Sequence, residues 1–357
     1  MTKNDTQAGI VGTGLYLPDK KMTAKEISKA TNGHWTEEAI KEKLGIIEKV
    51  VPESYDTKNP DQTPECNKDG TQSMGVKAAQ DALERTEVDP REIDLILCIG
   101  EEWKEYPLTT SGIYIQGQIG ATNAWAIDLQ QRCCTTVAAM KIAKDMMSAN
   151  ENIDTVMIVG GYRNLDFVDY TNKPMSMMYN LGAGGGALIL RKNLQKNIIL
   201  GTHIMSDGTL ARDAGVEYGG CANPITKKNV DKAYQSLNIF NPEHMKNRLN
   251  EVSMDNWMHC IDRAFEKSCL SKEKLGYLAV LHFKRSMHNY MLDLLNLDQN
   301  QTTYLSHYGH LGQIDQILSL RLGLEQNKIK DGTIIAMISA GIGYAWAANV
   351  VKWGDVK

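Results

Sequence analysis

At Asp128-Leu-Gln-Gln-Arg-Cys-Cys-Thr-Thr136 the chain passes from an apolar, strand-like run (124–127) into a helical run from about Val137 to Met147. A cysteine at such a junction lies among unpaired backbone N–H groups at the positive end of the helix dipole, which favours thiolate over thiol. Cys133 is therefore a candidate nucleophile. The alternative is that Cys133 and Cys134 are two small buried residues at a helix start, because free cysteine is usually a core residue.

The composition indicates a globular α/β protein without a polyanionic partner. With 357 residues, of which 42 % are hydrophobic, the chain is long enough for two domains or two fused halves. A net charge of −4 without a Lys/Arg-rich run favours neither nucleic acid nor an anionic membrane. No apolar run reaches the roughly 20 residues that span a bilayer, and the first seven residues do not resemble a signal peptide. We therefore expect a cytoplasmic protein.

The cysteine pattern predicts reduced thiols rather than a disulfide framework or a metal site. Seven cysteines, at positions 66, 98, 133, 134, 221, 260 and 269, make an odd number without a Cys-x-x-Cys pair. We therefore expect no bound metal and no disulfide, and one cysteine is available for catalysis.

Two glycine-rich stretches resemble nucleotide-binding loops and fail the tests for them. Gly9, Gly12 and Gly14 are followed by an extended segment and Pro18, whereas a dinucleotide loop needs a helix there, so a strand with a glycine turn is the better interpretation. The run from Gly182 to Leu190 lacks the Lys-Ser/Thr of a phosphate loop. Its glycines instead predict a close backbone approach beside an active site.

The chain contains a weak internal repeat. Continuous apolar strands such as Ile93–Gly100 and Thr155–Gly161 favour a parallel sheet that is covered on both faces. Three successive units recur in order: 79–99 with 261–281, 124–127 with 304–306, and 154–159 with 331–337. We interpret the chain as a duplicated α/β unit. Chance similarity of generic units is the alternative.

The repeat predicts one pocket at the carboxyl ends of the strands, where ligands of α/β sheets gather. His282, His310 and Cys133 each follow a predicted strand end. A thiolate with two imidazoles suits acyl transfer through a thioester. His282 as a satisfied core residue and His310 as an inert loop residue are the alternatives. The turn Ser339–Tyr344 and the N–H of Cys133 would supply oxyanion donors, although a tight turn also explains these glycines.

Six motifs in order along the sequence resemble the ketoacyl-ACP synthase III group of thiolase-like condensing enzymes, over nearly the whole length. They are Gly9-Ile-Val-Gly-Thr-Gly-Leu-Tyr-Leu-Pro18, the segment from Trp35 to Gly45-Ile46, Asp128-x4-Cys133, Leu281-His282, Tyr308-Gly309-His310 and Gly341-Ile-Gly-Tyr-Ala-Trp346.

This resemblance implies a thiolase-like α/β fold with two ααβαβ-type halves in five layers, here residues 1–195 and 196–357, in a homodimer. Cys133 would be the acylated nucleophile, and His282 would stabilise a carbanion or activate the second substrate. The amides of Cys133 and Ile342 would form the oxyanion hole. Acyl-CoA would be the donor, with its pantetheine arm near Trp35, and no cofactor beyond such a thioester would be needed.

Several residues depart from the family pattern. His310 replaces the family's Asn, and with Asp315 it forms a Gly-His-x-Gly-x-x-Asp turn that resembles members of specialised metabolism, some of which acylate hydroxyls or amines. Asp315, at the repeat position of Cys133, would orient a histidine as general base, or is only an acidic helix-start residue. Arg132 and Cys134-Thr135 replace small residues, and Arg132 would lower the pKa of the thiol further or shape the acyl pocket.

We carry three functional hypotheses. The first is condensation of a Cys133-bound acyl group with a malonyl thioester, and the second is transfer of that group to oxygen or nitrogen of a small acceptor. The third is a non-catalytic partner subunit of another condensing enzyme. An acidic acyl carrier protein could meet a basic patch at Lys284 and Arg285, although a solvated charged face is commoner.

Overall fold

The computed structural model describes residues 7–56, 69–101 and 103–355. Its centre is a mixed sheet in which nine strands are recorded, in the order β11-β12-β13-β8-β1-β7-β6-β4-β5. Their bounds are β1 Ala8–Tyr16, β4 Leu95–Cys98, β5 Trp125–Asp128, β6 Thr155–Tyr162, β7 Gly184–Lys192, β8 Lys196–Ser206, β11 Leu275–Val280, β12 Ile334–Gly341 and β13 Ala345–Asp355.

The sheet consists of two parts with the same strand order. In the first part β4 pairs in parallel with β5 and β6, and β7 lies antiparallel between β6 and β1. In the second part β11 and β12 are parallel, and β13 lies antiparallel between β12 and β8. A single residue pair, Gly9 with Ile198, joins the two parts. This topology is the duplicated α/β arrangement that the repeat predicts, while the boundary at 195/196 stays a prediction.

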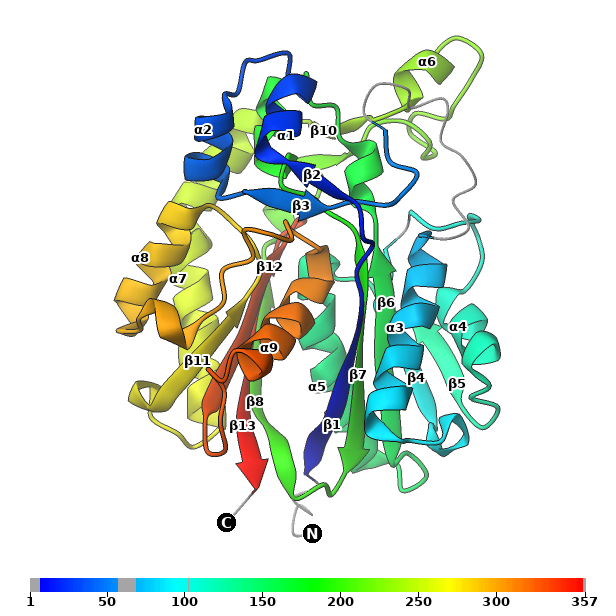
Figure 1. Cartoon of the computed structure of the whole chain (residues 1–357), viewed down its shortest axis with the longest axis vertical. Helices are drawn as coiled ribbons and strands as arrows, with labels where there is room; N and C mark the ends of the chain where they lie inside the picture. The colour runs from blue at the N-terminus through cyan, green and yellow to red at the C-terminus, as the bar shows by residue number, and fades with distance from the viewer. Residues whose placement is uncertain (1–6, 57–68, 102, 356–357) are drawn as a thin grey trace.

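Helices on both sides of each part complete five layers (Figure 1). α3 (Thr71–Thr86) and α4 (Ser111–Ile119) cover the outer face of the first part, and α7 (Pro242–Lys267) and α8 (Arg285–Leu295) flank the second. α5 (Thr135–Ala149) and α9 (Asp315–Glu325) contact strands of both parts and form the middle layer.

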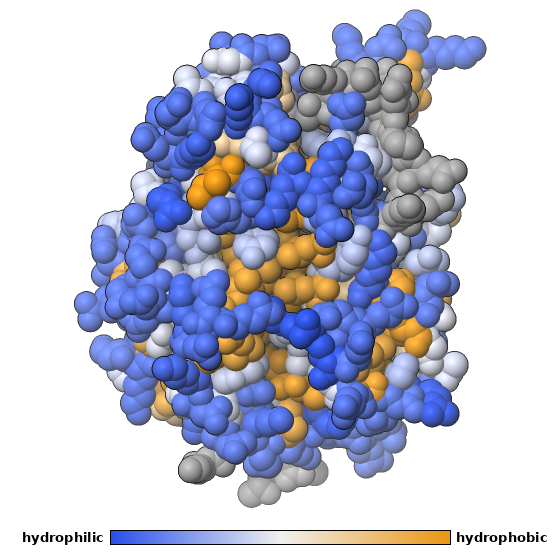
Figure 2. All heavy atoms as spheres, in the orientation of Figure 1, coloured by the Kyte–Doolittle hydropathy of each residue, from blue (hydrophilic) through white to orange (hydrophobic). Residues whose placement is uncertain are grey.

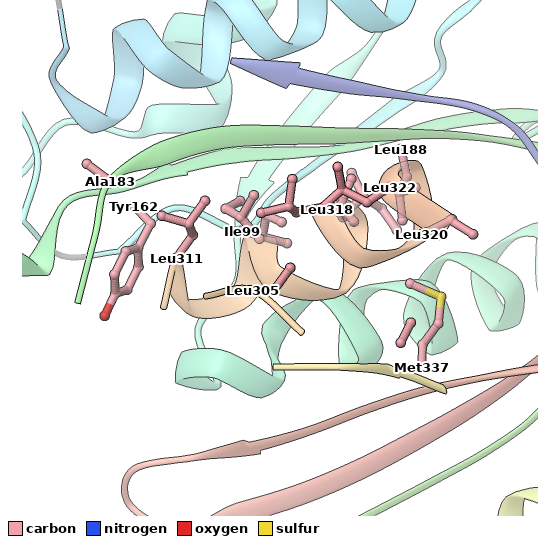
Figure 3. Close-up of a cluster of buried hydrophobic side chains, with 14 of the residues drawn as sticks. Ile99, Tyr162, Ala183, Leu188, Leu305, Leu311, Leu318, Leu320, Leu322 and Met337 are labelled. Atoms are coloured by element: carbon pink, nitrogen blue, oxygen red, sulfur yellow. The ribbon is translucent and has the colours of Figure 1, made fainter. Parts of the chain in front are cut away.

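The middle layer is the hydrophobic centre of the molecule. The first nine residues of α9 are all buried, since this helix is enclosed by both sheet parts. Figure 3 shows its Leu318, Leu320 and Leu322 packed against side chains from several other segments, with Leu311 and Tyr162 at one end of the cluster. At roughly 25 cal/mol per Å² of buried apolar surface, such packing is the main stabilising contribution. It fixes the starts of α5 and α9, where the candidate residues lie.

Short elements gather at one end of the molecule, at the top of Figure 1. Gly, Pro or Asn lies within or close to the ends of most of them, which limits their length. They are β2 Lys21–Thr23, α1 Ala24–Ala30, α2 Glu37–Ala39 with the π-turn Ile40–Leu44, β3 Glu48–Val50, β9 Ala214–Val216, α6 Val230–Ala233 and β10 Leu237–Ile239. Figure 2 shows apolar atoms gathered in the middle of the same view, within a largely hydrophilic surface.

Two details of the predicted repeat are wrong. Residues 304–306 form no strand; the counterpart of β5 is reduced to a bridge between Leu278 and Thr302. The 3-10 turn Arg132–Cys134 before α5 corresponds to the turn Gly312–Ile314 before α9, an offset of 180 residues. Asp315 is therefore the counterpart of Thr135 and not of Cys133. The offset between the halves is 182 residues for segments 79–99 and 261–281, and it falls to 180 here because the second half has the shorter connection.

The two glycine stretches allow close packing. β1 is a continuous strand with a bulge between Ile10 and Gly12, so the predicted glycine turn is wrong. A Cβ on Gly14 would lie 2.1 Å from the carbonyl oxygen of Ala78 in α3, and one on Gly185 would lie 2.2 Å from that of Met74. The backbone of β7 thus makes a close approach to α3, while Gly182, on which a Cβ would lie 2.9 Å from the Tyr308 carbonyl, approaches the turn that carries His310.

Candidate active site

Cys133 lies half-buried in the 3-10 turn that leads into α5. The turn is held by Thr135, whose hydroxyl donates to the carbonyl of Arg132 at 2.6 Å and accepts from the N–H of Gln131 at 2.8 Å. Ser339 of β12 donates to the Cys133 carbonyl at 2.5 Å. The nucleophile's backbone is therefore fixed by one side chain from α5 and one from the second part of the sheet.

His310 lies against the sulfur of Cys133. Its Nε2 is 3.2 Å from Cys133 Sγ, and its Nδ1 donates to Asp315 Oδ2 at 2.6 Å. The other carboxylate oxygen of Asp315 accepts from the N–H of Leu311 at 2.7 Å, and Asp315 has no exposed surface. The structure thus brings three of the predicted residues, Cys133, His310 and Asp315, into one continuous chain of contacts.

The charge environment of His310 favours its protonated form. Burial by itself lowers the pKa of this imidazole, but the charges of Asp315 and Cys133 outweigh it and hold the pKa well above its usual value. An imidazole between a carboxylate and a thiol is arranged to receive the thiol proton.

His282 follows β11 and has different surroundings. Its backbone N–H donates to Asp315 Oδ2 at 2.7 Å, so one carboxylate joins both histidines. Asn180 Nδ2 lies 3.0 Å from Nδ1, and the Gly45 carbonyl lies 3.4 Å from Nε2. Burial lowers the pKa of His282 to about 4, although Asp315 opposes this shift. Among the described contacts, His310 and not His282 touches Cys133 Sγ.

The turn at the end of β12 lies against the nucleophile. A Cβ on Gly341 would meet Gln131 O at 2.8 Å and Cys133 N at 3.2 Å, so only glycine allows this approach. In the described part of the chain, neither the N–H of Cys133 nor that of Ile342 donates to another group. Both backbone donors are thus available to a ligand.

Of the predicted substrate-binding residues, Arg132 lies next to Cys133 and bonds Glu101 Oε2 at 3.0 Å. Arg285 stacks 4.0 Å above the ring of Tyr304, which in turn lies 5.1 Å from the ring of His282. Lys284 is exposed. Trp35 packs on Tyr179, 6.3 Å between ring centres, and the recorded contacts do not connect it to Cys133.

Comparisons with known proteins agree with this architecture. Family models described as 3-oxoacyl-[acyl-carrier-protein] synthase III and its C-terminal part match residues 127–208 and 265–353. A β-ketoacyl-[acyl-carrier-protein] synthase III of Chlorobium phaeobacteroides is 26 % identical over 97 % of this chain and 99 % of its own length. One from Synechocystis is 24 % identical over 96 % and 97 %. Over nearly its whole length the chain is similar to ketoacyl-ACP synthase III enzymes.

Solved structures show the same fold for this synthase III-like chain. The 3-oxoacyl-[acyl-carrier-protein] synthase III of Aquifex aeolicus superposes with a TM-score of 0.79 at 20 % identity, covering 97 % of this chain and all of the other. The priming β-ketosynthase of the R1128 polyketide pathway gives 0.79 at 21 %, covering 98 % and 96 %. At these identities the agreement concerns the fold.

The neighbouring Cys134 differs from Cys133 in every relevant respect. Its thiol is fully buried and donates to the carbonyl of Ala345 at 3.4 Å. Burial first, and then the charge of Cys133, raise the pKa of Cys134 well above its usual value. A buried neutral thiol is a poor nucleophile, so the Asp-x4-Cys register and the structure point to the same cysteine.

Three further features of the described residues concern disulfides, metal-binding clusters and membrane-spanning helices. Cys66 lies outside the described residues; the six others, at 98, 133, 134, 221, 260 and 269, are free thiols. Among the described residues, no group of three His, Cys, Asp or Glu side chains is placed to hold a metal ion. None of the described helices is both long and apolar enough to cross a bilayer.

Asn180 and Glu101 lie at the site but were not predicted from the sequence. Glu101 follows the predicted strand 93–100, so the strand-end argument that selected His282 would also have selected it. Asn180 ends the Met- and Tyr-rich insertion, where neither spacing nor periodicity marks it. Its partner His282 is 102 residues away, and only the fold brings the two together.

Proposed function

We propose that this enzyme takes an acyl group from acyl-CoA onto Cys133 and condenses it with a malonyl thioester to a 3-oxoacyl product. The observation that carries the proposal is the continuous chain from Cys133 Sγ through His310 to Asp315, with distances of 3.2 and 2.6 Å. Similarity to ketoacyl-ACP synthase III enzymes agrees with it.

Before the first half-reaction His310 Nε2 has taken the thiol proton, and Cys133 Sγ attacks the thioester carbonyl of acyl-CoA as a thiolate. The oxyanion is met by the free N–H groups of Cys133 and Ile342. When the tetrahedral intermediate collapses, the C–S bond to CoA breaks and His310 returns the proton to the leaving thiolate. The result is acyl-Cys133 and free CoA thiol, with His310 neutral again.

In the second half-reaction the malonyl thioester loses CO2, and the electron pair of the broken C–C bond forms an enolate. Its carbon attacks acyl-Cys133, a new C–C bond forms, and Cys133 leaves as thiolate. His282 suits this step as a neutral group beside the reacting thioester, because burial holds its pKa at about 4. The reaction needs thioester substrates and no further cofactor.

The substrate-binding assignments follow from position. Arg132 and Glu101 border the nucleophile, where they would shape the acyl pocket. Lys284 and Arg285 lie directly after the His282 strand, and their positive charge would suit CoA phosphates or an acidic acyl carrier protein. Trp35 would contact the pantetheine arm. Free thiols at six described cysteines suit a reducing, cytoplasmic setting.

A second candidate is transfer of the acyl group to a hydroxyl or amine of a specialised-metabolism acceptor. The observation that favours it is Asp315. A carboxylate on Nδ1 makes His310 a stronger base at Nε2, which is what an alcohol or amine nucleophile needs and what decarboxylation does not. Once Cys133 is acylated, His310 would take the acceptor's proton.

A homodimer is the assembly that the surface supports. β5 lies at the end of the sheet order, and its Trp125 and Ile127 side chains are exposed. Ile113 and Tyr114 of α4, next to it, are exposed as well. An apolar edge strand is a ready site for pairing with a second copy. Light scattering of the purified chain tests this assignment, and a monomer at micromolar concentration contradicts it.

The decisive experiment combines a panel of acyl-CoAs with intact-mass analysis. We expect a mass increment on Cys133 with at least one donor, followed by CO2 release and a 3-oxoacyl product when malonyl-CoA is added. Product formation without CO2, after addition of an alcohol or amine, selects the second candidate. A pure homomeric protein that acylates with no donor supports the third hypothesis, a non-catalytic partner subunit.

A further inference from the structure

Lys49 is the one fully buried lysine among the described residues, and it lies beside the turn that carries His310. It is the central residue of β3 and has no exposed surface. Its Nζ donates to the carbonyls of Tyr179 and Leu181 at 3.0 and 2.6 Å and to the Tyr170 hydroxyl at 2.6 Å. All three ammonium donors are thus used on neutral acceptors.

The two carbonyls flank Asn180, which contacts both histidines. The Asn180 side chain meets His282 Nδ1 at 3.0 Å, and its backbone carbonyl accepts from the N–H of His310 at 2.8 Å. Gly182 N–H donates to His310 O on the other side, so residues 180–182 and His310 form a short parallel pair. Lys49 therefore clamps the peptide groups on both sides of the residue that touches His282.

The main chain around Lys49 leaves it little freedom. A Cβ on Gly309 would lie 2.7 Å from Lys49 Cβ, so the His310 turn rests directly on this residue. Val50 accepts from Ala183 and donates to Tyr308, which ties β3 to both neighbouring segments. Because the backbone and Cβ of Lys49 are held so closely, its Nζ has a fixed position and fixes the carbonyl groups to which it donates.

Burial of an amine without a carboxylate partner is costly. Desolvation lowers the pKa of Lys49 to about 7. A leucine or methionine would fill the same space without that cost, so the position is not explained by packing alone. What only an amine supplies here is simultaneous donation to two carbonyls on either side of Asn180.

We propose that Lys49 is a positioning residue of the active site, which by clamping the Tyr179 and Leu181 carbonyls holds Asn180 against His282 for the second half-reaction. This inference rests on the proposed function. Lys49 touches neither substrate nor sulfur, and it acts through Asn180. The first half-reaction depends on His310 and Asp315 and is affected less.

The test uses Lys49→Met in the full-length protein, with Lys144→Met as its matched control. Lys144 Nζ also donates to two backbone carbonyls, of Ile199 and Leu200 at 2.8 and 2.7 Å, in the second half of α5 and away from its start at Thr135. Two rates are measured by intact mass: formation of acyl-Cys133 from acyl-CoA, and its consumption after malonyl-CoA is added.

We expect Lys49→Met to slow consumption about 30-fold and formation less than threefold, since a misplacement of about 1 Å can cost on the order of 100-fold. Lys144→Met should change neither rate. Asn180→Leu should match Lys49→Met, and the double variant should be no slower than the slower single one. Losses that multiply, or that affect both rates equally, would show that Lys49 only supports the fold.

A readout without substrate separates this inference from the proposed function. In 13C-histidine-labelled protein, with the resonance assigned by His282→Gln, the His282 ring resonance should shift in Lys49→Met and not in Lys144→Met, because the Asn180 Nδ2 contact with Nδ1 is lost. An unchanged resonance refutes the role of Lys49. If wild-type protein never acylates, the proposed function fails, and this spectrum still decides the question.

Discussion

The helix starts of α5 and α9 have the same backbone and different chemistry. Each follows a 3-10 turn whose first residue is left-handed, Arg132 at φ 51° and Gly312 at φ 57°. In each, a side chain at the helix start accepts from the N–H four residues earlier, Thr135 from Gln131 and Asp315 from Leu311.

The two helix starts differ in the number of side-chain oxygens that they present. Thr135 has one side-chain oxygen, and it serves only its own turn. Asp315 has two: one repeats the bond of Thr135, and the other is 2.6 Å from His310 Nδ1 and 2.7 Å from His282 N. The comparison teaches that one helix start of a duplicated fold follows the nucleophile, while the corresponding position at the other start supplies the carboxylate that bonds the histidine facing that nucleophile.

The largest expected effect removes the nucleophile from its helix start. Cys133→Ala should abolish the mass increment with every acyl-CoA, because the buried thiol of Cys134 has a raised pKa and cannot replace it. Cys134→Ala is the control and should acylate at close to the wild-type rate. Full acylation that persists in Cys133→Ala would mean that the helix start has been assigned the wrong role.

The second prediction makes the two helix starts more alike. Asp315→Asn keeps an oxygen for the Leu311 N–H and removes the negative charge that faces His310. The pKa of His310 should fall, and acylation of Cys133 should slow on the order of 10⁴-fold, as expected when the carboxylate of a triad is lost. Single-turnover mass spectrometry measures the rate. An Asp315→Asn variant that acylates within fivefold of wild type would leave Asp315 as a helix-start residue only.

Local pattern was enough to predict one side of this comparison. Cys133, with a strand before it and a helix after it, and the strand ends at His282 and His310 were all visible in the sequence. The pairing of Asp315 with His310 was proposed as one of two alternatives, since both lie in one turn. The offset between the halves was misjudged because low identity hides a shift of two residues.

What could not be predicted is set by contacts between distant segments. Asn180 and His282 are 102 residues apart, and Lys49 lies 130 residues from the Tyr179 carbonyl that it holds. Nothing in the sequence around Lys49 indicates burial, because a lysine in a short polar strand is usually exposed. The sequence also did not predict which imidazole contacts the sulfur, because the positions of strand ends show which residues lie near one another but not which side chains touch.

The third prediction concerns how the free energy of unfolding depends on pH, because the pKa values of His282 and His288 are lowered whereas that of His310 is raised. Burial lowers the pKa values of His282 and His288 to about 4, below the value of about 6.5 in the unfolded chain. Their contribution to stability is therefore complete above pH 6.5 and is lost as the pH falls from there to about 4. The raised pKa of His310 acts in the other direction, with a contribution that is lost as the pH rises.

His288 allows this to be tested away from the sulfur. It packs against Tyr304, 4.9 Å between ring centres, and its Nε2 is buried without a partner. His288→Phe keeps an aromatic ring and removes the titration, so at pH 4.5 it should exceed the wild type in free energy of unfolding by about 2 kcal/mol. At pH 7.5 the difference should be smaller. Urea titrations at the two pH values measure it, and an equal difference at both refutes the acid effect.

The smallest expected effect tests the helix start that has one oxygen. Thr135→Val keeps the shape of the side chain and leaves the buried N–H of Gln131 and the carbonyl of Arg132 without their partner. The free energy of unfolding should fall by about 1 to 2 kcal/mol, the usual cost of such unsatisfied groups. Thr135→Ser retains both bonds and should lose less than half as much. Because the turn carries Cys133, acylation should slow several-fold in the valine variant alone. If valine and serine behave alike in both measurements, the hydroxyl at this position does not hold the turn, and the two helix starts resemble each other in backbone only.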